Sequence, residues 1–181
     1  MQNPKFIHLR VHTAYSLSEG AIKMGDLIHY LHQKNIPAIA VTDSGNMFGG
    51  KAFSKYASEE GVKPILGCTF FMRNPDADDL LRTKGKAVER DKLILLVMNS
   101  TGYENIMKLM KLFYLDNTAN GDDPQLKYSD LDKYNEGLIA LTGSVDGAIG
   151  RLLLENRAEE AEQMVQKLQG IFGEPFKVLR E

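Results

Sequence analysis

Two histidines and an arginine alternate near the N-terminus, at His8, Arg10 and His12. On an extended strand every second side chain points to the same face, so these three would share one face. Two neutral imidazoles can bind a metal, but a guanidinium between them cannot be a ligand and repels cations. The residue types therefore favour an interior polar cluster, in which Arg10 pairs with an acid such as Glu19 or Asp43.

Reactive residue types also follow later apolar runs. Asp43 is either a catalytic carboxylate or, more commonly for such a position, an acceptor for a loop N–H. Ser44 lacks a sequence motif that would make it a nucleophile, and the lone Cys68 is typical of a small core residue. The turn after Thr142 could bind phosphate through backbone N–H groups, yet no phosphate-binding fingerprint accompanies it.

Short apolar runs alternate with segments of helical periodicity, and these elements must position the reactive residues. We expect strands at 6–11, 37–42, 64–72, 93–98, 137–142 and 176–179, and helices at 22–34, 53–60, 101–113, 130–134 and 146–172. The last helix should break near Asn156, and Thr101 with Glu104 predicts a capping box. His29 and His32 are typical of an exposed helix face.

Alternating strands and helices predict an α/β fold with a parallel sheet, open or closed into a barrel. In such folds the chemistry lies at the carboxyl ends of the strands. Residues 73–90 are charged and poorly periodic, and they predict an exposed excursion from an otherwise single domain over 1–181.

Composition narrows the class of protein. The chain has 181 residues and a net charge of −2, which argues against a freestanding nucleic-acid binder. A single cysteine excludes an intrachain disulfide, and no apolar stretch approaches the roughly 18–20 residues of a membrane span. We therefore expect a cytoplasmic protein with no membrane contact.

Five segments occur in a fixed order and spacing, namely FIHLRVHTAYSLSEGA, AIAVTDSGNMFGG, GVKPILGCTFF, LILLVMNSTGYENI and EGLIALTGS. Together they resemble the PHP (polymerase and histidinol phosphatase) domain, and more narrowly the PHP domains that open the alpha subunits of bacterial DNA polymerase III. The resemblance runs from about Phe6 to Leu179. It implies a distorted, TIM-like (βα)7 barrel, here truncated after about six strands, without the palm, fingers and thumb of the polymerase.

The resemblance also implies a trinuclear metal centre, whose ligand positions fall on residues of this chain. These positions are Arg10, His12, Glu19, Ser44, Thr69, Lys92 and Ser144. Only His12 and Glu19 retain good ligands, and Arg10 and Lys92 are cations. A multi-metal centre needs many anionic or neutral ligands. We therefore expect vestigial positions, no metal or other cofactor, and no catalytic residues.

The function that the resemblance implies is a structural and docking module of a replicative DNA-directed DNA polymerase, a nucleotidyltransferase. Its partners would be the rest of the polymerase III alpha chain and the proofreading exonuclease subunit, with no direct DNA binding by this segment. Two alternatives stay open: an active metal-dependent PHP phosphoesterase or 3′–5′ exonuclease, and a phosphate-binding α/β enzyme that uses the turn after Thr142. For docking we favour surplus apolar residues on the helices, including Met107, Leu112 and Met164.

Overall fold

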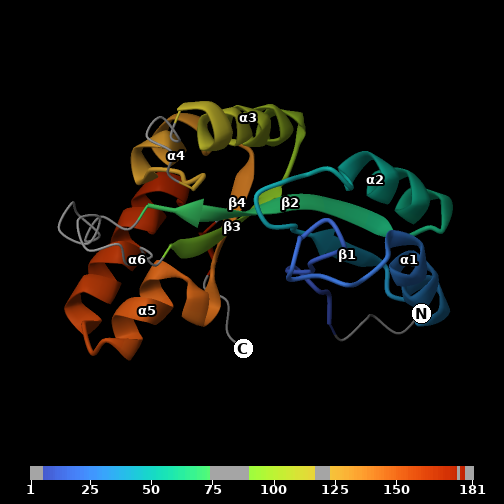
Figure 1. Ribbon diagram of the computed structural model, residues 1–181, viewed down its shortest axis with the longest axis horizontal. Helices are drawn as coiled ribbons and strands as arrows, with labels where there is room; N and C mark the ends of the chain where they lie inside the picture. Colours follow the sequence, from blue (N-terminus) through green and yellow to red (C-terminus); the bar gives the residue numbers. More distant parts are fainter. Residues whose placement is uncertain (1–5, 74–89, 117–122, 175, 178–181) are drawn as a thin grey trace.

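The computed structural model describes residues 6–73, 90–116, 123–174 and 176–177 (Figure 1). Most of the predicted excursion at 73–90 lies outside the described residues. In chain order the elements are α1 (Met24–Gln33), β1 (Ala38–Val41), α2 (Gly50–Glu59), β2 (Lys63–Met72), β3 (Asp91–Val97), α3 (Ser100–Lys111), the π-helical turn η2 (Leu112–Asp116), α4 (Tyr128–Tyr134), β4 (Leu138–Thr142), the 3-10 turn η3 (Ser144–Asp146), α5 (Ala148–Leu154), α6 (Ala158–Phe172) and β5 (Phe176–Lys177).

The described strands form one mixed sheet in the order β1-β2-β3-β4-β5. The β1–β2 and β4–β5 pairs are parallel, whereas β2–β3 and β3–β4 are antiparallel. The prediction of a purely parallel sheet is therefore wrong. An apolar run such as that of β3 indicates that the strand is buried on both faces. It does not indicate whether the strand runs parallel or antiparallel to its neighbours. The α/β class is confirmed, and closure into a barrel stays a prediction.

The predicted first strand at 6–11 is not a regular strand. The His8 carbonyl accepts a hydrogen bond from the Ala40 N–H at 2.8 Å, and the Val11 carbonyl accepts one from the Thr42 N–H at 2.9 Å. The two acceptors are three residues apart and the two donors only two apart, so this segment follows β1 with one extra residue, as at a bulge. That extra residue removes the strict alternation on which the shared face of His8, Arg10 and His12 was predicted.

Helices cover the sheet in separate groups, with α1 and α2 beside β1 and β2, and with α3, α4, α5 and α6 around β3 and β4 (Figure 1). Phe70 and Ile106 are fully buried between the sheet and α3. Met164 and Leu168 of α6 are 8% and 2% exposed and belong to the same core. The predicted docking role of Met164 is therefore wrong, because this residue faces the sheet.

Two helix boundaries show how local chemistry sets the elements. The N-cap of α3 is Asn99, whose side chain accepts a hydrogen bond from the Gly102 N–H at 2.9 Å, so the predicted capping box at Thr101 is wrong. Asn156 adopts a left-handed conformation, with φ of 60°, between α5 and α6. Asparagine tolerates this conformation better than most residues, and the predicted helix break at Asn156 is confirmed. Within the described ranges, no helix is both long and apolar enough to cross a membrane.

Candidate functional site

Asp43 joins the first two loops at the carboxyl end of β1. Its Oδ1 accepts hydrogen bonds from the Thr13 N–H and the Ser16 hydroxyl, both at 2.6 Å, and its Oδ2 accepts one from the Thr13 hydroxyl at 2.8 Å. Asp43 is only 2% exposed. Both oxygens are thus occupied by neutral donors, which favours the loop-holding role over catalysis. Thr13 and Ser16 lie 30 and 27 residues away in the chain, so sequence-local turn rules could not name them.

Glu19 is the centre of a second group of polar contacts at this end of the sheet. The Ser44 hydroxyl donates to Glu19 Oε2 at 2.5 Å, and the Lys92 ammonium lies 3.3 Å from Glu19 Oε1. His12 Nδ1 lies 3.3 Å from both Glu19 Oε2 and the Ser44 hydroxyl. Residues from the N-terminal loop, the β1–α2 loop and the start of β3 therefore converge on one carboxylate.

Asp146, which the sequence analysis did not single out, completes this arrangement. Its Oδ2 lies 3.5 Å from Arg10 Nη2 and 3.6 Å from Lys92 Nζ. Arg10 thus pairs with Asp146 instead of with Glu19 or Asp43 as predicted, because those two acids already have other partners. The η3 turn after β4 delivers Asp146, and an acid placed just after a predicted strand was the available signal. We call Arg10, His12, Glu19, Ser44, Lys92 and Asp146 the mouth cluster.

Thr69 and Ser144, the two other vestigial positions, stabilise the backbone around the mouth cluster. Thr69 is fully buried, forms a parallel bridge with Ser44, and donates its hydroxyl to the Thr42 carbonyl at 2.9 Å. Ser144 begins η3 with a left-handed φ of 55°. In this turn the N–H groups of Asp146 and Gly147 donate to the carbonyls of Gly143 and Ser144. Those two N–H groups are therefore not free to bind phosphate.

The protonation state of His12 follows from its neighbours. Its Nδ1 also lies 3.2 Å from the Ser16 hydroxyl, whose proton goes to Asp43, while the proton of Ser44 goes to Glu19. Assigned from this network, Nδ1 carries a hydrogen and Nε2 the lone pair. Burial lowers the pKa of His12 from its ordinary value, and the opposing charge of Glu19 does not fully offset that effect. His12 is therefore mainly neutral near pH 7.

Glu19 is ionised at neutral pH. Burial acts to raise its pKa, but the hydrogen bond from Ser44 and the positive charge of Lys92 together hold that pKa below its ordinary value. These contacts stabilise the charged carboxylate. The mouth cluster therefore contains two carboxylates, Glu19 and Asp146, matched by the two cations Arg10 and Lys92.

The residues present do not fit the trinuclear metal centre that the resemblance implies. Across the ranges that the structure describes, no three His, Cys, Asp or Glu side chains gather closely enough to hold a metal ion. Both oxygens of Asp43 are occupied, and His12 and Glu19 contact each other. Arg10 and Lys92 also bring positive charge to the cluster, which opposes cation binding. No metal-dependent step can therefore be derived from this side-chain set.

Other candidates from the sequence lie away from the mouth cluster. Cys68 is fully buried, and burial strongly raises the pKa of its thiol, which makes it unreactive. His29 and His32 lie on the exposed face of α1, as predicted, where His32 Nδ1 is 3.3 Å from Glu60 Oε2. These residues are therefore typical of core and surface positions respectively.

Comparison with known proteins identifies the family. The family model of the PHP domain matches residues 8–179, and this chain therefore belongs to the PHP domain family. The DNA polymerase III subunit alpha of Borreliella burgdorferi is 40% identical over 177 residues, which cover 95% of this chain and 15% of that protein. The corresponding subunit of Thermus aquaticus is 36% identical over 174 residues, covering 95% of this chain and 14% of that protein.

The chain thus spans about 15% of the length of the curated relatives it matches. Among solved structures, it is similar to an amidohydrolase from Chromobacterium violaceum with bound sulfate and no metal. That likeness has a TM-score of 0.49 and 12% identity, and covers 87% of this chain and 72% of the amidohydrolase chain.

Proposed function

We propose that this chain is the PHP domain at the N-terminus of a bacterial DNA polymerase III alpha subunit, and that the domain is a catalytically inactive structural and docking module. The similarity to alpha subunits along nearly the whole chain supports the first part. The mouth cluster supports the second, because Lys92 and Arg10 stand at two positions where the family resemblance places metal ligands, and they neutralise the carboxylates of Glu19 and Asp146.

Inactivity follows from the chemistry of the cluster. PHP-type hydrolysis would need a metal to lower the pKa of a water molecule and so generate a nucleophile near neutral pH. A lysine ammonium or a guanidinium supplies charge but has no coordination position at which water could be activated. The mouth cluster is thus suited to holding loops together, and catalysis would reside in the remainder of the polymerase.

The biological setting is DNA replication in the bacterial cytoplasm. The parent chain is a DNA-directed DNA polymerase, and the domain contacts the rest of that chain and the proofreading exonuclease subunit. Its near-neutral charge and the pairing of both cations in the mouth cluster argue against DNA binding by this domain.

Metal analysis of the purified chain tests the inactive-module proposal. After dialysis we expect no stoichiometric zinc, manganese or iron, and no hydrolysis of phosphate monoesters or DNA 3′ ends with added Mn²⁺ or Zn²⁺. One or more tightly held metals per chain would contradict the proposal. So would an activity that survives repurification, disappears in His12→Ala and persists in His29→Ala, the matched exposed histidine.

A binding measurement tests docking separately. The purified proofreading exonuclease subunit of the same bacterium should bind the full-length protein directly, without other replication subunits. If the full-length protein binds but a form lacking residues 1–181 binds equally well, docking lies elsewhere on the polymerase. The structural role would then be the only part of the proposal left standing.

A further inference from the structure

One flank of α3 carries apolar side chains that face solvent. Tyr103 and Met107 are 46% and 44% exposed, and Met110 is half-buried. The turn η2 continues α3, because its first residue, Leu112, has helical backbone angles, and in that turn Tyr114 is 43% exposed. We call Tyr103, Met107, Met110 and Tyr114 the α3 stripe. Its members follow one another at intervals of four, three and four residues, which is the spacing of the d and a positions of a heptad.

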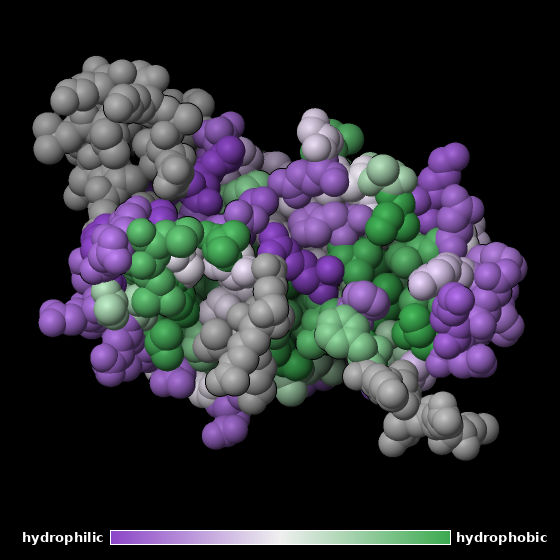
Figure 2. All heavy atoms as spheres, turned by 90° about the horizontal axis from the view of Figure 1, so that it is seen from below, coloured by the Kyte–Doolittle hydropathy of each residue, from purple (hydrophilic) through white to green (hydrophobic). Residues whose placement is uncertain are grey.

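The core of this chain does not use the α3 stripe. A different face of α3, which includes Ile106 and Leu109, is buried against the sheet. The neighbouring helix α4 and the residues after it lie on the other flank, where the Asn105 side chain donates to the Glu136 carbonyl at 3.0 Å. Figure 2 shows that apolar side chains also reach the surface on another face of the molecule, so exposure alone does not distinguish the stripe. Its heptad spacing does, because a seam of this kind is typical of a helix that packs along a second helix.

Two exposed residues of opposite charge border the α3 stripe. Glu104 directly follows Tyr103, and Lys111 directly follows Met110, so both occupy e positions of the same heptad. Within the described ranges neither forms an ion pair with another residue. The third charged residue of α3, Lys108, is turned towards α4, since its Nζ lies 5.7 Å from the centre of the Tyr134 ring.

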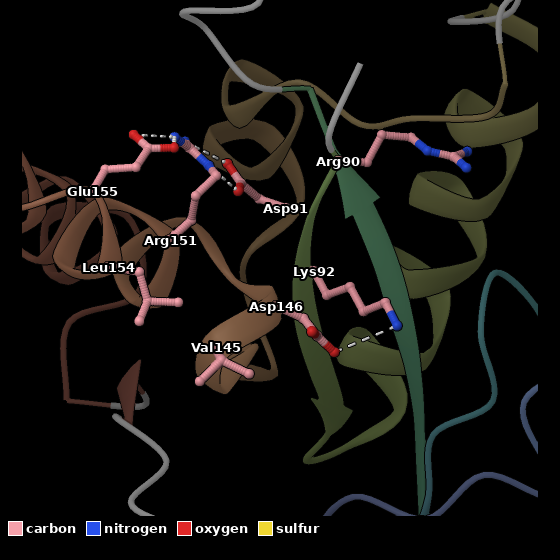
Figure 3. Close-up of a pocket in the computed structure, with 8 residues that line it drawn as sticks. All are labelled: Arg90, Asp91, Lys92, Val145, Asp146, Arg151, Leu154 and Glu155. Carbon is pink, nitrogen blue, oxygen red and sulfur yellow. Dashed lines mark hydrogen bonds and ion pairs between the residues drawn. The ribbon is translucent and has the colours of Figure 1, made fainter. Parts of the chain in front are cut away.

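The charges around the cavity between β3 and α5 are, by contrast, matched within the chain. Figure 3 shows Lys92 beside Asp146, at 3.6 Å, and Arg151 donating to both oxygens of Asp91. Such a surface gives no indication of the charge of a partner. The α3 stripe does, because an unpaired acid and an unpaired base stand seven residues apart along it.

A second α3 that runs antiparallel to the first complements this arrangement. In an antiparallel pair of helices, each a residue packs beside a d residue of the other helix, and the e positions of both helices lie on the same side of the seam. Tyr103 then packs against Tyr114 of the second copy, and Met107 against Met110. Glu104 faces Lys111 of the second copy. The two-fold symmetry repeats each of these contacts, because the same surface is used on both copies.

We infer that the α3 stripe is a self-association surface, through which two copies of this chain form a symmetric dimer with antiparallel α3 helices. This inference goes beyond the proposed function, which includes no contact between copies. The 12 residues of α3 extend over only about 18 Å. Small interfaces are typical of transient complexes, so the dimer is weak and depends on protein concentration.

Sedimentation velocity of the full-length protein, at up to about 100 µM, tests the inference because that range detects weak complexes. The wild-type protein should associate reversibly, and Met107→Glu should weaken the association by about tenfold or more, as for a central apolar contact. Glu104→Lys and Lys111→Glu should each weaken it by about tenfold, because each places like charges opposite each other twice in the dimer. Lys51→Glu, the same charge change at an exposed lysine of α2, is the control and should have no effect.

A mixture of two variants tests the antiparallel arrangement. Glu104→Lys gives a stripe with two lysines, and Lys111→Glu gives one with two glutamates. Each should associate poorly alone, whereas the two variants mixed should associate as tightly as the wild-type protein. Circular dichroism confirms that all variants are folded.

Three results would overturn the inference. The first is a wild-type protein that stays monomeric over the whole concentration range. The second is an association that Met107→Glu does not weaken, and the third is a mixture that associates no better than either variant alone. If Met107→Glu abolishes binding of the exonuclease while the wild-type protein is monomeric, the α3 stripe belongs to the exonuclease and not to a second copy.

Discussion

The Lys92 ammonium lies 3.3 Å from Glu19 Oε1, although the two residues are 73 positions apart in the chain. The start of β3 delivers the lysine, and the loop after the N-terminal segment delivers the glutamate. Both occupy positions that the family resemblance gives to metal ligands. A protein cation therefore neutralises a carboxylate of the mouth cluster, and this relationship can be tested through stability.

Removal of the Lys92 charge should destabilise the fold modestly. In Lys92→Met, Glu19 loses a charged partner, and we expect a loss of about 1 kcal/mol in the free energy of unfolding, because the glutamate is partly exposed. Adding Glu19→Gln should recover part of the loss in a double-mutant cycle measured by urea denaturation. Lys55→Met, at an exposed pair with Glu59, is the control and should change little. Strictly additive effects of Lys92→Met and Glu19→Gln would show that the pair does not interact.

Asp43 should matter more than Asp146 for stability. Asp43→Ala leaves the Thr13 and Ser16 donors without their buried acceptor, at an expected cost of about 3 kcal/mol. Asp146→Ala removes a half-exposed carboxylate and should cost less than about 1 kcal/mol. Urea denaturation of the two variants measures the difference. A smaller effect at Asp43 than at Asp146 would contradict the loop-holding role.

Acid should weaken the fold through His12 before it does so through Glu19. The pKa of His12 is lowered from 6.5 in the folded state, so below about pH 6.5 the unfolded chain binds a proton that the folded chain does not. The folded state therefore becomes less stable as the pH falls below about 6.5. The pKa of Glu19 is lowered from 4.5, so its contribution is full above pH 4.5 and is lost as pH falls further.

Unfolding measured as a function of pH checks this order. The His12→Asn variant should lose part of the decrease in stability that the wild-type protein shows below pH 6.5, whereas His29→Asn should not. A wild-type protein whose His12-dependent stability instead rises on acidification would show that the histidine charges more readily when folded.

Replacing Gly102 or Gly170 with alanine should have opposite effects on the stability of the fold. A Cβ on Gly102 would overlap the carbonyl oxygen of Gly137, so Gly102→Ala must displace the start of α3 and should cost about 1–3 kcal/mol or more. A Cβ on Gly170 in α6 meets nothing within 4 Å. Gly170→Ala should therefore stabilise the protein by up to about 1 kcal/mol, through helix propensity. Thermal unfolding of both variants decides, and a tolerated Gly102→Ala would contradict the close packing.

Patterns that depend on local residue types were sufficient to predict the burial of β1, the break at Asn156 and the exposed histidines of α1. Apolar runs and helical periodicity report which side chains leave water, and that tendency is encoded within a few residues. The family resemblance was confirmed as well, since it rests on motifs read in order along the chain.

Strand direction, the irregular segment beside β1 and the partner of each charge were decided by the tertiary structure. Arg10 contacts Asp146, which is 136 positions away in the chain. The carboxylate of Asp43 accepts its hydrogen bonds from Thr13 and Ser16 rather than from a cation. A carboxylate accepts whichever donors the folded backbone brings within about 3 Å, and distance along the chain says little about that. The sequence by itself determined the α/β class, most of the helices and strands and the family, and packing decided which polar groups meet in the mouth cluster.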